Sequence, residues 1–193
     1  MTTLHPSRRR FLGLTGDPNP KSQQRWERQS DKIPDYILTT QHGIQLRFYS
    51  DLVKSRIPII NFFYTHCNGI CMPTTANLKK VHAKLGERVG RDILFLSISL
   101  DPERDTPAAL LEYAAMYRHP PGWLFLTGKF QELEEIRRSI GAYDLDPLID
   151  ADREQHTGIV TFGNERTDRW AALPALMDAD GLTRSIKRIT RPT

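Results

Sequence analysis

Two long, uninterrupted apolar runs constrain the fold of this chain more than any other feature. They read IPIINFFYT at residues 57–65 and DILFLSISL at residues 92–100. Such runs, rich in β-branched and aromatic residues, are typical of strands that are buried on both faces of a sheet. Between them, apolar residues recur at helical spacing over residues 73–88. Because strand–helix–strand crossovers are right-handed, we expect the two strands to lie parallel in one sheet.

The rest of the chain also alternates between strand and helix patterns. The further predicted elements are a hairpin over 36–52 that turns at His42-Gly43, a helix over 105–117 capped by Asp105 or Thr106 with Pro107 first, a strand at 123–128, a helix over 129–141, two strands joined around Gly163-Asn164, and a last helix over 174–189 that breaks near Gly181. Alternating elements require a central sheet with helices on its faces. We therefore predict a three-layer α/β fold with a mixed central sheet and an N-terminal β-hairpin.

The two ends of the chain carry much of its formal net charge of +4. We assign residues 1–30 to a flexible basic arm and residues 31–193 to a single domain. The sequence SRRRFL at 7–12 is similar to the centre of a twin-arginine export signal, but polar residues follow it where such a signal needs an apolar segment. We expect a solvated arm, with a remnant export signal as the alternative. No apolar run reaches the roughly 18 residues of a membrane-spanning helix, and no basic groove with interleaved aromatic residues predicts nucleic-acid binding.

The only two cysteines of the chain, Cys67 and Cys71, directly follow the first apolar run. Proline disfavours helical geometry at the residue before it, so Pro73 places both thiols in a loop just ahead of the predicted helix. The unpaired N–H groups and the dipole of a helix N-terminus favour thiolate over thiol. Thiolate is the form that disulfide exchange and soft metal ions such as Cu(I) or Zn²⁺ require.

A metal held by two thiolates needs a further ligand, and the candidates are six histidines. His5 lies in the arm, His42 in a turn and His119 in a loop, and His82 is expected on the solvent face of the predicted helix 73–88. Two histidines remain as candidates. His156 directly precedes a predicted strand that neighbours the cysteine strand, and His66 adjoins Cys67 in the sequence. We favour His156 and keep His66 as the alternative.

Four segments in the same order resemble the Sco/SenC family of copper-delivery proteins. They are NFFYTHCNGICMPTTANL at 61–78, LSISLDPERDTPAALLEYAAMY at 96–117, GWLFLTG at 122–128 and QHTGIVTFG at 155–163. The resemblance covers about residues 31–190 and implies a thioredoxin-like fold that binds copper, as Cu(I) or Cu(II), through Cys67, Cys71 and His156. It also implies a role in maturing the copper centre of cytochrome c oxidase or a related enzyme. The implied partners are a copper-receiving protein such as oxidase subunit II and a thiol reductant.

Three features bear on how far this resemblance extends. Met72 separates Cys71 from Pro73, whereas members of the family usually have proline directly after the second cysteine; we expect Met72 to fill the core rather than bind metal. Asp101 is a candidate to support the ligands, although a cap or turn role is the default. Family members are usually exported, which favours an extracytoplasmic location, while the incomplete signal leaves the cytoplasm open.

The main alternative function is that of a thiol–disulfide oxidoreductase. In that reading Cys67 attacks a partner's disulfide and Cys71 resolves the mixed disulfide. The spacing CxxxC and the lack of proline between residues 150 and 162 argue against it, because thioredoxin-like reductases usually carry CxxC and a cis-proline before the strand that begins near Thr157. A structural zinc module would need a fourth protein ligand and is the least favoured of these classes.

Overall fold

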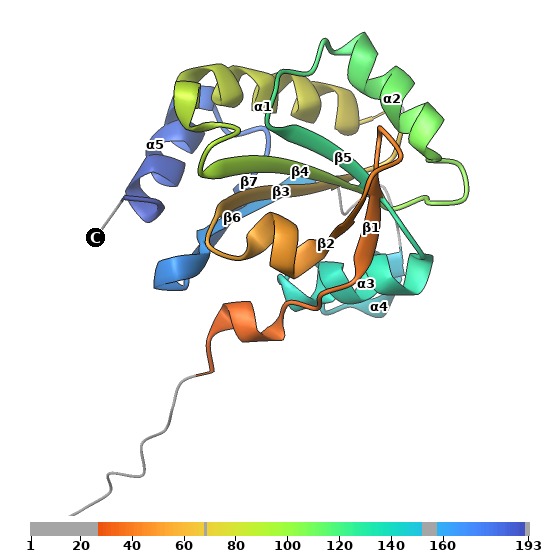
Figure 1. Ribbon diagram of the computed structural model, residues 1–193, viewed down its shortest axis with the longest axis horizontal. Helices are drawn as coiled ribbons and strands as arrows, with labels where there is room; N and C mark the ends of the chain where they lie inside the picture. Colours follow the sequence, from red (N-terminus) through yellow and green to blue (C-terminus); the bar gives the residue numbers. More distant parts are fainter. Residues whose placement is uncertain (1–26, 68, 152–157, 192–193) are drawn as a thin grey trace, which may run out of the picture.

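The computed structural model describes residues 27–67, 69–151 and 158–191 and shows one seven-stranded sheet between two layers of helices (Figure 1). The strand order across the sheet is β2-β1-β5-β4-β3-β6-β7. The strands are β1 (Ile37–Thr40), β2 (Gln45–Arg47), β3 (Ile57–Phe63), β4 (Ile93–Ser99), β5 (Trp123–Thr127), β6 (Ile159–Asn164) and β7 (Arg169–Pro174).

The centre of the sheet is parallel and its two sides are antiparallel. Strand β4 pairs in parallel with β3, from Ile57↔Ile93 to Phe63↔Ser99, and also with β5. Strand β1 joins β5 and strand β6 joins β3, both in antiparallel pairs. Every residue of β3 and β4 is buried. The predicted crossover and the predicted mixed sheet with an N-terminal hairpin are therefore confirmed.

Among the described residues, five α-helices flank the sheet. They are α1 (Cys71–Leu85), α2 (Pro107–Met116), α3 (Phe130–Ser139), α4 (Pro147–Ala151) and α5 (Ala179–Ile189). Figure 1 shows α1, α2 and α5 together on one face and α3 with α4 on the other. Each face has its own hydrophobic core, and the side chains of β3 alternate between them: Ile59 and Phe63 pack toward α1, and Ile60 and Phe62 pack toward α3. The three-layer thioredoxin-like architecture is thus the observed fold.

Helix α1 begins two residues earlier than the sequence predicts. Cys71 is its first residue, whereas both cysteines were expected in the preceding loop. Pro73 is tolerated as the third helical residue, because N–H groups in the first turn have no carbonyl partner within the helix. The rule that proline displaces the preceding residue from helical geometry is therefore overridden here.

The C-terminal third of the fold differs from the prediction at three places. The β6–β7 turn consists of Glu165–Thr167 and Asp168, so Gly163-Asn164 belongs to β6. Helix α5 begins after the capping residue Asp178, whose Oδ1 accepts the N–H of Gly181 at 2.8 Å, so this glycine lies in the first turn and does not break the helix. The short helix α4 was not predicted.

Residues 28–30, assigned above to the arm, pack against the domain. The N–H and the hydroxyl of Ser30 donate to Asp168 at 3.0 and 2.7 Å, and the side chain of Gln29 donates to the carbonyl of Ser139 at 2.7 Å. The folded part of the chain thus reaches at least to Arg28, which forms an ion pair with Glu165. Residues 1–26, with the SRRRFL sequence, lie outside the described residues. Among the described helices, none has the length and apolar character needed to span a membrane.

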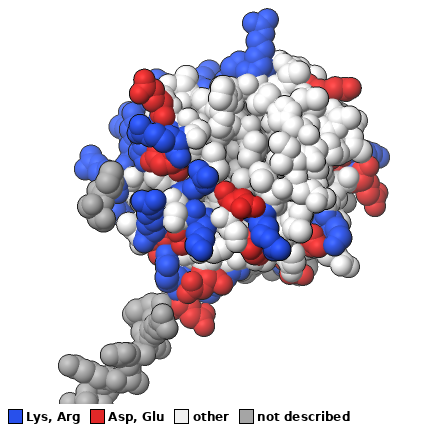
Figure 2. Space-filling model, in the orientation of Figure 1, with Lys and Arg blue, Asp and Glu red and all other residues white. Residues whose placement is uncertain are grey.

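Charge is unevenly distributed over the face shown in Figure 2. Lysine and arginine alternate with aspartate and glutamate over its left and lower parts, whereas the upper right part, where α2 and the β1–β2 hairpin lie, is largely uncharged. Ile44 of the hairpin turn and Met116 at the end of α2 are both exposed. These two elements therefore offer contact area with little charge.

Candidate metal centre

The two cysteines lie where the carboxyl end of β3 turns into α1. Both are free thiols, and their relative exposures are 6% for Cys67 and 1% for Cys71. The loop between β3 and α1 holds Cys67 through its N–H, which donates to the carbonyl of Tyr64 at 3.2 Å. Cys71 is fixed by its place in the first turn of the helix. One sulfur therefore belongs to a loop and the other to the rigid start of a helix.

The surroundings of Cys67 favour its thiolate. Burial raises the pKa of this thiol, but hydrogen bonds from the side chain and backbone N–H of Cys71, the backbone of Gly69 and the side chain of Tyr64 lower it, and the net shift is downward. The helix N-terminus contributes as the sequence predicts, because the Cys71 N–H is one of its unpaired donors. Cys67 is thus prepared to act as a metal ligand or as a nucleophile.

Aromatic side chains lie in the same buried cluster as Cys71. Tyr113 of α2 is buried, packs on Phe63 and Tyr117, and shares a 2.9 Å hydrogen bond with the hydroxyl of Thr75. Burial raises the pKa of Tyr113, the bond to Thr75 opposes this rise, and the neighbouring ionisable side chains of Tyr117 and Cys71 add to it. Tyr113 therefore stays neutral beside Cys71.

A buried carboxylate, Asp105, holds the start of the cysteine loop. It is fully buried, and it accepts the N–H of Thr65 at 3.1 Å, the hydroxyl of Thr65 at 2.5 Å and the hydroxyl of Ser99 at 2.6 Å. Asp105 is not the cap of α2, since Thr106 takes that role by accepting the N–H of Ala109. The loop that carries Cys67 is therefore tied to the end of β4 and the start of α2.

Strand β6 brings its preceding residues to the cysteine end of the sheet. It pairs antiparallel with β3 up to Asn61↔Val160, and two more residues in that register bring Gly158 level with Phe63. A Cβ on Gly158 would lie 3.4 Å from the side chain of Ile70, the residue before Cys71. His156 itself lies in residues 152–157, outside the described residues.

Helix α1 also holds Gly158, the first described residue after His156, in place through hydrogen bonds. The amide of Asn77 donates to the carbonyls of Ala175 and Met177 at 2.8 and 2.7 Å, and the N–H of Ala175 donates to the carbonyl of Gly158 at 2.8 Å. Gly158 is thus connected through two hydrogen bonds to the helix that begins with Cys71.

A buried ion pair anchors the chain before residue 152. Arg137, which is 2% exposed, donates to both oxygens of Asp150 at 2.7 and 3.0 Å, and Arg138 adds a bond of 2.6 Å. Hydrogen bonds from Arg137 hold the pKa of Asp150 well below its usual range; burial opposes this, and the N–H of Asp144 and the charges of both arginines add to it. Helix α4 is therefore fixed to α3 at its last turn.

The other described histidines are dispersed. Nδ1 of the exposed His66 lies 2.9 Å from the hydroxyl of Thr65. His82 was predicted to lie on the solvent face of its helix, and this is wrong. Its ring stacks on Trp123, and its Nε2 lies 2.9 Å from the carbonyl of Pro121. The rings of His42 and His119 lie 6.4 Å apart. Within the described residues, no three histidine, cysteine, aspartate or glutamate side chains form a group that could hold a metal.

The structure differs from the prediction for Met72 and agrees with the default prediction for Asp101. Met72 is 49% exposed, so it does not fill the core as expected. Asp101 occupies a turn, which is the role expected by default. Its carbonyl accepts the N–H groups of Arg104 and Asp105. Tyr113 and the Arg137–Asp150 pair were not predicted from the sequence. The only available signal for Tyr113 was an aromatic residue at helical spacing, which is also typical of ordinary core.

The chain is similar in sequence and in fold to known proteins. The sequence profile of the SCO1/SenC family matches residues 24–191. The SCO1 protein homolog of Bacillus subtilis is 38% identical over 129 residues, which are 65% of this chain and 62% of that protein. The solved structure of Bradyrhizobium japonicum ScoI with copper bound is 26% identical, covers 80% of this chain and 96% of that chain, and has a TM-score of 0.63. BsSco, described as a member of the Sco family of cytochrome c oxidase assembly proteins with a disulfide switch, is 21% identical, covers 84% and 95%, and has a TM-score of 0.65. The chain belongs to the SCO1/SenC family.

Proposed function

We propose that this protein carries a copper ion as cargo, held by Cys67, Cys71 and His156, and delivers it to a copper enzyme. The observation that carries the proposal is the convergence of two free cysteines and the start of β6 at one end of the sheet. His156 is two residues from Gly158, and two residues of extended chain span at most about 7 Å. Since Gly158 lies beside Ile70, the third ligand is within reach of the cysteine loop.

The donor set suits copper in both of its common oxidation states. Thiolates are soft ligands that prefer Cu(I), and an imidazole extends the site toward Cu(II). The lowered pKa of Cys67 reduces the cost of deprotonating the thiol when the metal binds. Three protein donors leave the ion open on one side, so an acceptor protein can begin to bind it before the donor releases it.

The receiving protein that we propose is a copper subunit of cytochrome c oxidase, such as subunit II, or of a related enzyme. The naming of BsSco as an oxidase assembly protein and the copper in the Bradyrhizobium ScoI structure support this assignment. Such a partner makes an extracytoplasmic site of action part of the proposal. Copper loading also requires both cysteines reduced, so a thiol reductant is a second partner.

Anaerobic titration of the reduced protein with Cu(I), and separately with Cu(II), tests the ligand set. We expect one ion per chain, loss of Cu(I) binding in Cys67→Ala or Cys71→Ala, and at least tenfold weaker Cu(II) binding in His156→Ala. His66→Ala is the matched control, because this histidine adjoins Cys67 in the sequence and is exposed. Unchanged Cu(II) affinity in His156→Ala, or an equal loss in His66→Ala, would contradict the proposed third ligand.

A second candidate function, thiol–disulfide exchange, is favoured by the lowered pKa of Cys67 next to a second free thiol. The Cys67 thiolate would attack a partner's disulfide and release one partner thiolate. The Cys71 thiolate would then attack the mixed disulfide, so the partner leaves as a dithiol and Cys67–Cys71 becomes the disulfide. His156→Ala separates the two functions, because it should weaken Cu(II) binding and leave the reductase rate near that of the wild type.

A further inference from the structure

The two cysteines of the proposed copper site are nearly inaccessible from outside, whereas the residue after them is not. Cys67 and Cys71 are 6% and 1% exposed, and Met72 is 49% exposed. A methionine side chain is apolar and is among those most often buried, so its exposure beside two buried sulfurs adds nothing to the core. Copper that arrives bound to another molecule can therefore contact Met72 more readily than either cysteine.

The geometry of α1 directs the Met72 side chain toward the cysteine loop. Cys71 and Met72 are the first and second residues of this helix. Each Cα–Cβ bond of an α-helix tilts toward the N-terminus, so a long side chain in the first turn extends back over the start of the helix. The sulfur of Cys67 lies at that start, because it accepts hydrogen bonds from the side chain and the N–H of Cys71. The Met72 thioether and the Cys67 sulfur are thus at the same end of α1.

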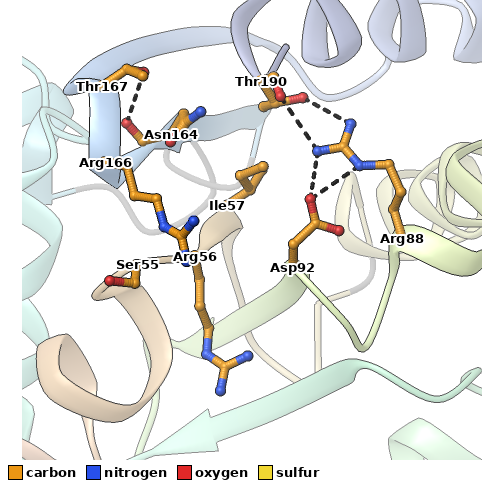
Figure 3. A pocket seen from close by; sticks show the side chains of 9 residues that line it. All are labelled: Ser55, Arg56, Ile57, Arg88, Asp92, Asn164, Arg166, Thr167 and Thr190. Carbon is orange, nitrogen blue, oxygen red and sulfur yellow. Dashed lines mark hydrogen bonds and ion pairs between the residues drawn. The ribbon is translucent and has the colours of Figure 1, made fainter. Parts of the chain in front are cut away.

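Two uncharged segments meet near the start of α1. Residues 69–78 and 170–177 contain no lysine, arginine, aspartate or glutamate, and Asn77 joins them by donating to the carbonyls of Ala175 and Met177 at 2.8 and 2.7 Å. The opposite end of the sheet differs, because three arginines and an aspartate line the cavity of about 250 Å³ drawn in Figure 3. At the cysteine end, these two segments offer no carboxylate that would hold harder cations and no cationic side chain that would repel Cu(I).

We propose that Met72 is the entry ligand of the copper site, the residue that binds arriving Cu(I) first and transfers it to Cys67 and Cys71. A thioether is a soft donor that prefers Cu(I) to hard ions such as Mg²⁺. It carries no proton, so it binds the ion directly, whereas a thiol must be deprotonated first. The inference rests on the proposed function, because it assumes that the two cysteines hold the cargo.

The transfer consists of ligand exchange, and copper stays Cu(I) throughout. The Met72 sulfur first binds the ion and displaces one donor atom of the molecule that carried it. The Cys67 thiolate, which the hydrogen bonds at the start of α1 stabilise, then binds Cu(I) as the remaining donor of the carrier leaves. Cys71 binds last, loses its proton to water and replaces the Met72 sulfur. Met72 therefore affects the rate of loading and not the final affinity.

Anaerobic stopped-flow loading of the reduced full chain from Cu(I)–bicinchoninate tests the proposal, because the loss of the chelate's colour reports the transfer. Met72→Leu keeps the size and apolar character of the side chain but lacks the sulfur. We expect its second-order rate constant of loading to fall about tenfold and its Cu(I) affinity to stay within about twofold of the wild type. Met72→Gln should slow loading equally. Met116→Leu is the matched control, since Met116 is 71% exposed and the carbonyl of the next residue, Tyr117, accepts a bond from Lys79, about two turns beyond Met72.

The measured rates and affinities can also contradict this role of Met72. Equal rate constants for the wild type and Met72→Leu, or an equal loss in Met116→Leu, would overturn it. A loading rate that does not depend on protein concentration would do the same, since copper would then leave the chelate before it met the chain. A loss of Cu(I) affinity in Met72→Leu would make Met72 a permanent ligand and not an entry ligand. Unchanged Cu(I) affinity in Cys67→Ala would instead contradict the proposed cargo ligands, whatever the rates of the Met72 variants.

Discussion

At the scale of single residues, the chemistry of the site depends on what donates to the Cys67 sulfur. The Cys71 thiol lowers the pKa of Cys67 together with the backbone N–H groups of Cys71 and Gly69. Substituting Cys71→Ala removes only the side-chain contribution, so the pKa of Cys67 should rise. Thiolate absorbance in the far ultraviolet, followed across a pH titration, measures this shift. A pKa in Cys71→Ala equal to or below that of Cys67 in the wild type would contradict the described hydrogen bonding.

Asp105 is the residue whose loss should loosen the cysteine loop. In Asp105→Asn, the amide presents donors to Thr65 and Ser99, which themselves donate, so buried polar groups lose their partners. We expect a loss of about 1–3 kcal/mol in the free energy of unfolding, measured by urea denaturation. Glu103→Gln is the control, because that exposed side chain should change stability by less than about 0.5 kcal/mol. Equal stability of the two variants would refute the anchoring role.

At the scale of elements, the attachment of α4 to α3 has a defined pH dependence. The folded-state pKa of Asp150 is lowered, so its contribution to stability is fully present above the unfolded pKa of about 3.9 and is lost as the pH falls below that value. Asp150→Asn should cost about 3 kcal/mol at neutral pH. The difference from the wild type should shrink as the pH is lowered from about 5 to about 3.

The pH series of urea denaturation curves tests this sign directly. Glu112→Gln serves as the control, because this exposed carboxylate of α2 has no hydrogen bond or ion pair among the described residues. A wild-type advantage over Asp150→Asn that stays constant, or grows, toward low pH would show that the ionised carboxylate is not what stabilises the contact.

Strong, long patterns were predictable from the sequence, and features that depend on distant neighbours were not. The two long apolar runs predicted β3 and β4, because a strand that is buried on both faces carries apolar residues at nearly every position. Gly163 was mistaken for a turn residue, but it pairs with Trp170, and a Cβ there would lie 2.4 Å from the indole ring. Helix α4 has only five residues and is held by Arg137, so its own sequence shows no helical periodicity.

The candidate site divides in the same way. The spacing after an apolar strand indicated Cys67 and Cys71, because chemistry in α/β folds concentrates at the carboxyl ends of strands. Asp105 was predicted only as one of two candidate caps beside Thr106, since the motif alone does not show that its carboxylate turns toward Thr65. His156 stays a prediction for which the position of Gly158 is the structural support.

At the scale of the whole molecule, the N-terminal boundary of the fold can be tested by truncation. A chain of residues 31–193 lacks the bonds from Gln29 and Ser30 to Asp168 and from Gln29 to Ser139, which a chain of residues 27–193 keeps. At about 0.5–1.5 kcal/mol net per hydrogen bond, we expect the loss of these four bonds to make the shorter chain less stable by about 2–6 kcal/mol. Thermal and urea unfolding compare the two. Equal unfolding midpoints would place the start of the domain at residue 31.

The length of strand β3 sets the distance between the two ends of the sheet at which partners could bind. Its seven residues hold Ile57 and Phe63 roughly 20 Å apart in a strand that is hydrogen-bonded on both sides. This separation is about two screening lengths at physiological salt, so charge gathered at one tip is hardly felt at the other. A molecule that binds at the Ile57 end of the strand would therefore leave the cysteine end, at Phe63, accessible to a second partner.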